Sequence, residues 1–152
     1  MLQTAIRRAN SSDVPALNEL MHACSAYQGE YSAILRGYSI TTEQLAADEV
    51  YVLEAGRKIL AFYSLTGIAS SLELDLMFVA NEYQGKGIGA TLFEHMKKKA
   101  VSLGASEVKI VSNPPAEAFY TRMGAKKIGV KAPSGRVTWD RPILLLATRG
   151  VA

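Results

Sequence analysis

The chain has 152 residues, of which 49% are hydrophobic and 20% charged, and these values are typical of one globular domain rather than of a disordered chain. The formal net charge of +3 is small and the charges are interspersed, which argues against binding to nucleic acid. One cysteine cannot form an internal disulfide, and no apolar run reaches the ~20 residues of a membrane span, so we expect a cytoplasmic protein that contacts no membrane.

The N-terminal part of the chain predicts one strand followed by helices. A strand is expected over residues 3–8, and an amphipathic helix over residues 14–24, with Pro15 in its first turn. A short helix is expected around residues 31–35. Another is expected to begin near Thr42.

The pattern then changes to strands. Residues 50–54 and 59–66 are rich in strand-forming residues, and a short Gly-containing turn joins them as a hairpin. A third strand is expected over residues 72–79. Its alternation predicts one face turned to the core, with Leu72, Leu74, Leu76 and Phe78, and an opposite face that carries two acids, Glu73 and Asp75.

The remaining elements mix helices and strands. A long helix is expected up to about Leu103, and the later expected elements are a strand at 108–112, a helix at 116–123, a strand at 127–130, a polar loop at 132–141 and a strand at 143–148. Strands and helices do not alternate strictly, so the sequence predicts a mixed α/β sheet in one domain, residues 1–152.

The segment from Gln84 to Gly89 has the composition of an anion-binding turn. Three glycines allow the backbone N–H groups to approach a ligand closely, and the helix that follows adds partial positive charge at its N-terminus. Lys86 adds a mobile cation and Gln84 a side-chain donor. The turn therefore predicts a site for phosphate or pyrophosphate.

Two other phosphate motifs fit this segment less well. A P-loop requires Ser or Thr after its lysine, and Gly87 stands there instead. The dinucleotide-binding pattern is matched by Gly85 to Ala90, but that pattern normally opens the first βαβ unit and is followed by an acid at the end of the next strand. Neither condition is met, so a nicotinamide-dependent oxidoreductase is the weaker alternative.

Two blocks of the sequence resemble the GCN5-related N-acetyltransferase (GNAT) family. Gln84, Gly87 and Gly89 match that family's cofactor motif, (Gln/Arg)-x-x-Gly-x-(Gly/Ala). A second family block is matched at its own spacing by Asn113, Ala116, Phe119, Tyr120 and Gly124. Asn81 stands where many members have proline.

The resemblance implies a twisted mixed sheet of six or seven strands with helices on both faces. It also implies that the sheet splays apart after Val79 and Ser112 and binds acetyl-coenzyme A in the wedge, with a bulge near Phe78 and Val79 freeing backbone groups. The residues that it assigns to the cofactor are Phe78, Val79, Gln84, Gly85, Lys86, Gly87, Ile88, Gly89, Asn113 and Tyr120. No metal is implied.

The catalytic roles that the resemblance implies fall on two residues. Tyr120 occupies the position of a general acid that protonates the thiolate leaving group, although it could instead only pack against the cofactor. Glu73 lies on the polar face of the third strand at an offset used for the catalytic base, with Asp75 as a second candidate and direct loss of the proton to solvent as a third. The Val79 N–H could polarise the thioester carbonyl.

The acceptor is expected to be a primary amine on a small molecule or peptide, attacking directly in a ternary complex. Tyr27, Tyr31, Tyr38 and Trp139 are candidates to line its pocket. A non-catalytic acyl-CoA-binding module on the same fold stays an alternative. Cys24 is interpreted as a core residue, and His22 and His95 do not predict a metal site. The resemblance also implies a homodimer, because members of this family often pair through their C-terminal strands, and the apolar run 143–147 is a candidate for that contact.

Overall fold

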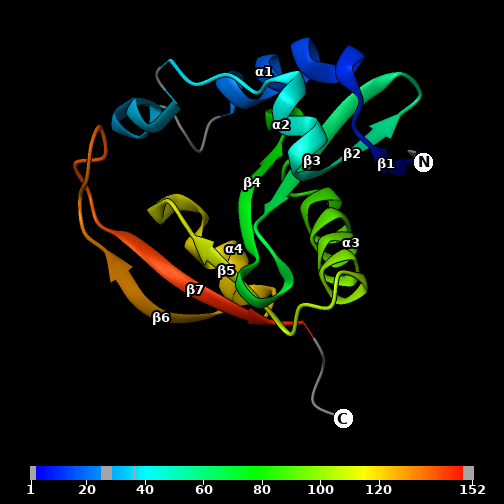
Figure 1. Ribbon diagram of the computed structural model, residues 1–152. Coiled ribbons are helices and arrows are strands. Elements are labelled where there is room, and N and C mark those ends of the chain that lie inside the picture. Colours follow the sequence, from blue (N-terminus) through cyan, green and yellow to red (C-terminus); the bar gives the residue numbers. More distant parts are fainter. Residues whose placement is uncertain (1–2, 25–28, 36, 149–152) are drawn as a thin grey trace.

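A mixed β-sheet runs through the computed structural model, which describes residues 3–24, 29–35 and 37–148 (Figure 1). Within these residues the sheet has seven strands in the order β1-β2-β3-β4-β5-β7-β6, and only the β4–β5 pair is parallel. The strands are β1 (Ala5–Arg8), β2 (Glu49–Ala55), β3 (Lys58–Thr66), β4 (Glu73–Val79), β5 (Glu107–Val111), β6 (Lys126–Lys131) and β7 (Arg141–Ala147). The predicted mixed sheet is confirmed.

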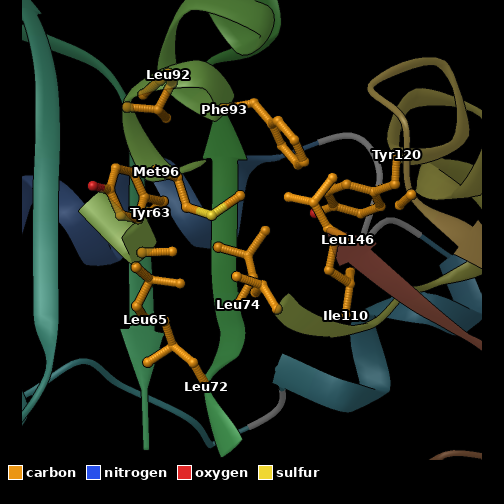
Figure 2. Packing of buried hydrophobic residues seen from close by; sticks show 14 of the residues in the cluster. Tyr63, Leu65, Leu72, Leu74, Leu92, Phe93, Met96, Ile110, Tyr120 and Leu146 are labelled. Atoms are coloured by element: carbon orange, nitrogen blue, oxygen red, sulfur yellow. The ribbon is translucent and has the colours of Figure 1, made fainter. Parts of the chain in front are cut away.

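Helices cover both faces of this sheet and enclose two separate cores. On one face lie α1 (Val14–Ala23) and α2 (Thr42–Ala47), which pack with Phe62 and Phe78. On the other face α3 (Ile88–Ser102) and α4 (Glu117–Arg122) pack with β3, β4, β5 and β7 (Figures 1 and 2). The segment expected to be a short helix is a 3-10 helix, Gly29–Leu35. No helix among the described residues is long and apolar enough to cross a membrane.

The start of α1 is fixed to the sheet by a network of charges. Asn10 and Asp13 form a reciprocal capping box around the 3-10 helix Ser11–Asp13, which leads directly into α1. The Arg7 guanidinium donates to both carboxylate oxygens of Asp13, at 2.8 and 2.9 Å, and to Glu54. These hydrogen bonds from Arg7 lower the pKa of the largely buried Asp13 carboxyl.

The alternation predicted for β4 is wrong beyond its first residues, because the strand contains a bulge. Leu65 pairs with Leu74 and Ser64 pairs with Leu76, which leaves Asp75 without a partner on β3. Leu72 and Leu74 therefore pack on the α3 face, while Leu76 and Phe78 pack on the α1 face. The bulge lies at Asp75, not near Phe78 and Val79 as expected.

The sheet opens between β4 and β5. The two strands are paired only at Glu73 and Lys109, where the Lys109 N–H donates to the Leu72 carbonyl at 3.0 Å. Beyond this point β4 continues to Val79 without a ladder to β5, and Figure 1 shows the two strands diverging. The predicted splay of the sheet between β4 and β5 is confirmed.

Candidate active site

The glycine turn leads directly into α3, as the sequence predicts. Gly85 and Gly87 have φ values of +76° and +81°, a conformation that few residues other than glycine adopt without strain. Gly87 is the N-cap of α3, and the first hydrogen bond of that helix runs from the Thr91 N–H to the Gly87 carbonyl at 3.0 Å. The N–H groups that precede Thr91 in the first turn have no partner within the helix, and no acidic side chain lies in that turn.

Glycines at positions 85 and 87 leave this turn open. A Cβ at Gly85 or Gly87 would meet nothing within 4 Å, so both face open space. Gly89 is different, because a Cβ there would lie 3.2 Å from the Phe119 ring of α4. The turn therefore presents backbone N–H groups and the positive end of a 15-residue helix to whatever lies in front of it.

The Gln84 side chain fastens the turn to the protein. Its Nε2 donates to the Val79 carbonyl at 3.1 Å and lies 3.3 Å from Asn81 Oδ1. Gln84, although exposed, thus closes the loop between β4 and α3. Its amide is placed to hold the turn in position, whereas the sequence analysis expected a donor to the ligand.

The backbone of Val79 faces the opening of the sheet. The Ala80 N–H donates to the Leu60 carbonyl at 2.8 Å, and bonded pairs alternate along an antiparallel ladder. Phe78 is consequently a bonded partner of Phe62, and the N–H and C=O of Val79 point away from β3. Gln84 occupies the carbonyl, so the N–H remains directed at the gap beside β5.

A cavity of about 480 Å³ lies between the glycine turn, the end of β4 and α4. We call it the glycine-side cavity. Val79, Gly87 and Tyr120 line it, together with a largely apolar surface that includes Cys24, Met77, Phe119 and Met123. Among its described lining residues one is a cation, Arg122, which the sequence analysis did not single out.

Tyr120 lies at the inner end of this cavity and is 8% exposed. Its ring lies beside Phe93 of α3, with ring centroids 6.1 Å apart (Figure 2), and it packs against Phe119 with centroids 5.4 Å apart. The Tyr120 carbonyl accepts from the Ala125 N–H at 3.0 Å, which closes the C-terminal end of α4. The ring is therefore held from both sides, and the phenol belongs to a site built by α3, α4 and β4.

A second cavity, of about 290 Å³, lies on the opposite side of β4. We call it the acid-side cavity. Glu73 and Asp75 line it together with Tyr38, Leu76 and Phe78, so the two acids share one site as predicted. Because Met77 and Val79 face the glycine-side cavity, successive residues of β4 connect the two cavities across the opening of the sheet.

Burial and nearby charges affect the titration of Asp75 on β4. The Asp75 carboxyl is partly removed from water, and this, with the nearby charges of Glu73 and Asp48, raises its pKa. Asp75 is thus easier to protonate than an ordinary aspartate. Tyr38, on the opposite wall, also has a raised pKa because of burial, and its hydroxyl is hydrogen-bonded to Gln44 at 2.9 Å.

Asn113 lies on the acid side of the opening rather than on the cofactor side to which the resemblance assigned it. It is 2% exposed and lines the acid-side cavity. Its Oδ1 accepts from the Trp139 indole N–H at 3.3 Å, and Trp139 packs edge-on against Tyr31 with ring centroids 5.0 Å apart. The loop that carries Trp139 is thereby joined to the segment that carries Tyr31.

The other predicted residues are placed as follows. The Ile88 side chain is buried in the core below α3, so only its N–H can reach a ligand. The Lys86 ammonium lies 5.7 Å from the centre of the Tyr83 ring and does not line the glycine-side cavity. Tyr27 lies outside the described residues. Cys24 is 4% exposed, in agreement with its interpretation as a core residue, and it also lines the glycine-side cavity.

Two cations on the acid side were not predicted. Arg141 was assigned to a loop, but β7 begins with it, and Lys131 is the last residue of β6. The two residues are partners in the β6–β7 ladder and both line the acid-side cavity. Among the described residues no group of three His, Cys, Asp or Glu side chains could hold a metal ion.

Comparison with known proteins identifies a family for the central part of the chain. The profile of the acetyltransferase (GNAT) domain matches residues 46–124, which is more than half of the chain. A search of curated proteins found no match.

Solved structures resemble the whole chain. The PaiA N-acetyltransferase of Thermoplasma acidophilum, solved in complex with coenzyme A, is 23% identical with a TM-score of 0.77, over 96% of this chain and 99% of that one. The ribosomal-protein-S18-alanine N-acetyltransferase of Escherichia coli is 18% identical with a TM-score of 0.74, over 99% and 97%. A chimera of the Vibrio cholerae spermidine N-acetyltransferase SpeG and hSSAT is 19% identical with a TM-score of 0.73, over 96% of each chain. At these identities the likeness shows a common fold.

Proposed function

The chain belongs to the GNAT acetyltransferase family, and we propose that it transfers an acetyl group from acetyl-CoA to a primary amine by direct attack in a ternary complex. The observation that carries the proposal is the pair of cavities on either side of the opening between β4 and β5. One cavity has the features of a cofactor site and the other has two carboxylates suited to an ammonium.

The glycine-side cavity fits coenzyme A in three respects. The turn at Gly85–Gly87 and the N-terminus of α3 offer N–H groups and positive potential for the pyrophosphate. The Val79 N–H points into the opening, where a pantetheine amide can pair with it like an added strand. The apolar lining at Met77, Phe119 and Met123 suits the pantetheine arm.

When bound, acetyl-CoA supplies a thioester whose carbonyl carbon accepts the amine nitrogen, so that a C–N bond forms, the C–S bond breaks and a thiolate leaves. Glu73 is proposed to take the proton that the ammonium must lose, with Asp75 beside it holding the charge of the amine. Tyr120 is proposed to donate its phenolic proton to the thiolate. The Val79 N–H is proposed to stabilise the oxygen of the carbonyl that is attacked.

Two features of the site support this division of roles. The carboxylates and Tyr120 lie on opposite sides of β4, so the base and the acid do not compete for one proton. The raised pKa of Asp75 also makes a carboxylate–carboxylic acid pair easier to form, and such a pair can relay the proton to solvent.

The test has two measurements. Acetyl-CoA should raise the melting temperature of the protein, whereas NAD(H) should not, because only a ligand of the folded state stabilises it. Release of free thiol from acetyl-CoA should then depend on added amine, across a panel of polyamines, amino acids, amino sugars and peptides. Stabilisation by CoA with no thiol release from any amine would favour a non-catalytic acyl-CoA-binding module, and stabilisation by NAD(H) alone would favour an oxidoreductase.

We further propose a cytoplasmic homodimer, although the sequence pointed to a different surface. The apolar run 143–147 lies in β7, which is enclosed between β5 and β6, and its Leu144 and Leu146 fill this chain's own core. The edge strand β6 instead exposes Ile128 and Val130. A sedimentation mass near 16.4 kDa at micromolar concentration would contradict the dimer.

A further inference from the structure

The acid-side cavity has walls of opposite charge. Glu73 and Asp75 stand on β4, and Lys131 and Arg141 stand on the paired ends of β6 and β7. No ion pair joins these four residues to one another or to any other residue in the described part of the chain. Two acidic and two cationic side chains thus line one cavity of about 290 Å³ without forming an ion pair with one another.

Two buried hydrogen-bond donors in this cavity have no partner among the described residues. They are the Asn113 Nδ2 and the Arg141 Nε, and both residues line the cavity. A buried donor left unpaired costs about 1–3 kcal/mol, so folded proteins retain few of them. Two such donors in one small cavity point to a ligand that accepts hydrogen bonds there.

The orientation of the Asn113 amide follows from its neighbour. An indole N–H is only a donor, so the atom of Asn113 that faces Trp139 must be the oxygen. The Nδ2 is therefore the free end of the amide, and it cannot exchange places with Oδ1 without losing the bond to Trp139. Trp139 acts here as a positioning residue for Asn113.

We propose that the acceptor is a small amino acid, whose ammonium lies at Glu73 and Asp75 and whose carboxylate is bound by Asn113, Arg141 and Lys131. The inference rests on the proposed acetyl transfer and names the substrate class of that site. A polyamine satisfies the acids, but it places a second cation against Arg141 and Lys131 and leaves both buried donors unpaired. A carboxylate satisfies the donors and the charge together.

The first experiment compares substrates on the wild-type enzyme and needs no variant. Initial rates of thiol release from acetyl-CoA are measured with a panel of free amino acids, with the carboxamide of each, and with spermidine. Each carboxamide keeps the amine and removes the negative charge, and it also represents the N-terminus of a peptide. For the best amino acid we expect kcat/KM to fall by about 10²-fold or more in its carboxamide and to be lower still for spermidine.

The second experiment assigns the discrimination to a residue. Arg141→Gln should raise KM for the amino acid by at least about tenfold and change KM for its carboxamide little. The variant should therefore show a smaller difference in kcat/KM between the two substrates. The control is Lys127→Gln, which removes one positive charge from the exposed part of the same β6–β7 ribbon, outside the cavity. It should leave both values unchanged.

The outcomes separate the two proposals. If spermidine or the carboxamides have kcat/KM values as high as those of the amino acids, the proposal of an amino-acid acceptor is wrong, but the proposal of acetyl transfer stands. If no amine releases thiol, the proposed function fails. Calorimetric titration of the amino acids into the CoA-bound protein then tests the inference separately. Binding of an amino acid that becomes weaker in Arg141→Gln supports the carboxylate subsite, and no measurable binding of any amino acid refutes it.

Discussion

Substitution of Gly87 by Asp tests the anion site at the start of α3. The change has two opposite effects on the protein without ligand. An aspartate at φ +81° costs about 1 kcal/mol of backbone strain, whereas aspartate in place of glycine at the N-cap of a helix contributes only about 0.3 kcal/mol. The stability of the unliganded protein should therefore change by no more than about 1 kcal/mol.

Binding of acetyl-CoA should be affected far more. The new carboxylate projects into the open space in front of the turn, since no atom lies within 4 Å of a Cβ at Gly87. Two like charges about 5 Å apart at an effective dielectric constant of ~20 repel by roughly 3 kcal/mol. We therefore expect the dissociation constant for acetyl-CoA to rise by about 10²-fold.

Thermal unfolding with and without ligand measures both effects. At a ligand concentration of about 100 times its dissociation constant the wild-type protein gains about 2.7 kcal/mol, and the variant at the same concentration gains only about 0.4 kcal/mol. For a domain of this size these values correspond to shifts of about 5–10 °C and about 1 °C. Gly56→Asp is the matched control, because Gly56 also has positive φ (+61°) and open space around its Cβ but lies in the β2–β3 turn, outside the glycine-side cavity. Equal stabilisation of wild type and Gly87→Asp by acetyl-CoA would refute the anion site.

Three further substitutions test individual side chains. Tyr120→Phe keeps the ring contacts, so its affinity for acetyl-CoA should stay within a few-fold of the wild-type affinity while kcat falls by about 10²-fold. An unchanged kcat, measured where chemistry is rate-limiting, would remove the hydroxyl from the mechanism. Asp75→Asn should raise the melting temperature at pH 7, because a carboxyl whose pKa is raised by folding destabilises the native state once it is ionised. This gain in melting temperature should disappear below about pH 4, and a lower melting temperature at pH 7 would contradict the reasoning. Asp13→Asn has the opposite sign. The bonds from Arg7 lower the pKa of Asp13, so the variant should lose about 2 kcal/mol at pH 7 in denaturant unfolding, and the loss should shrink as pH falls below about 4; a pH-independent difference would show that the charge is not responsible.

The elements that follow local rules could be predicted from the sequence. Pro15 and the glycine turn at Gly87 located α1 and α3, and the resemblance of two motif blocks to the GNAT family implied that the glycine turn and Tyr120 share one site. Each of these signals depends on residues close together in the chain.

The features that were missed depend on pairing between distant segments. The bulge at Asp75 is visible only in the register of β3 against β4, and it moves Leu76 and Phe78 to the face opposite the one that simple alternation predicts. Arg141 was assigned to the polar loop 132–141, and Lys131 was left out of the strand predicted at 127–130. Only the β6–β7 ladder extends the strands to include them and brings them to the acids of β4.

The side of the opening on which a residue lies was also not predictable. Asn113 belongs to the block that marks the cofactor region in sequence, yet its side chain turns to the acid-side cavity, where Trp139 holds it. Gln84 likewise matches a cofactor motif but bonds to the Val79 carbonyl. A motif fixes a position along the chain, whereas the direction of a side chain depends on partners that the motif does not contain.

The central claim is that the acetyl group passes directly between two substrates held in the two cavities at once. Initial rates measured over a matrix of acetyl-CoA and amine concentrations test it most directly. Direct attack in a ternary complex predicts double-reciprocal lines that intersect, and a protein that carries no acetyl group after incubation with acetyl-CoA alone. Parallel lines, together with an acetylated protein in intact-mass spectra, would contradict the account and point to a covalent intermediate on a residue of the glycine-side cavity such as Cys24.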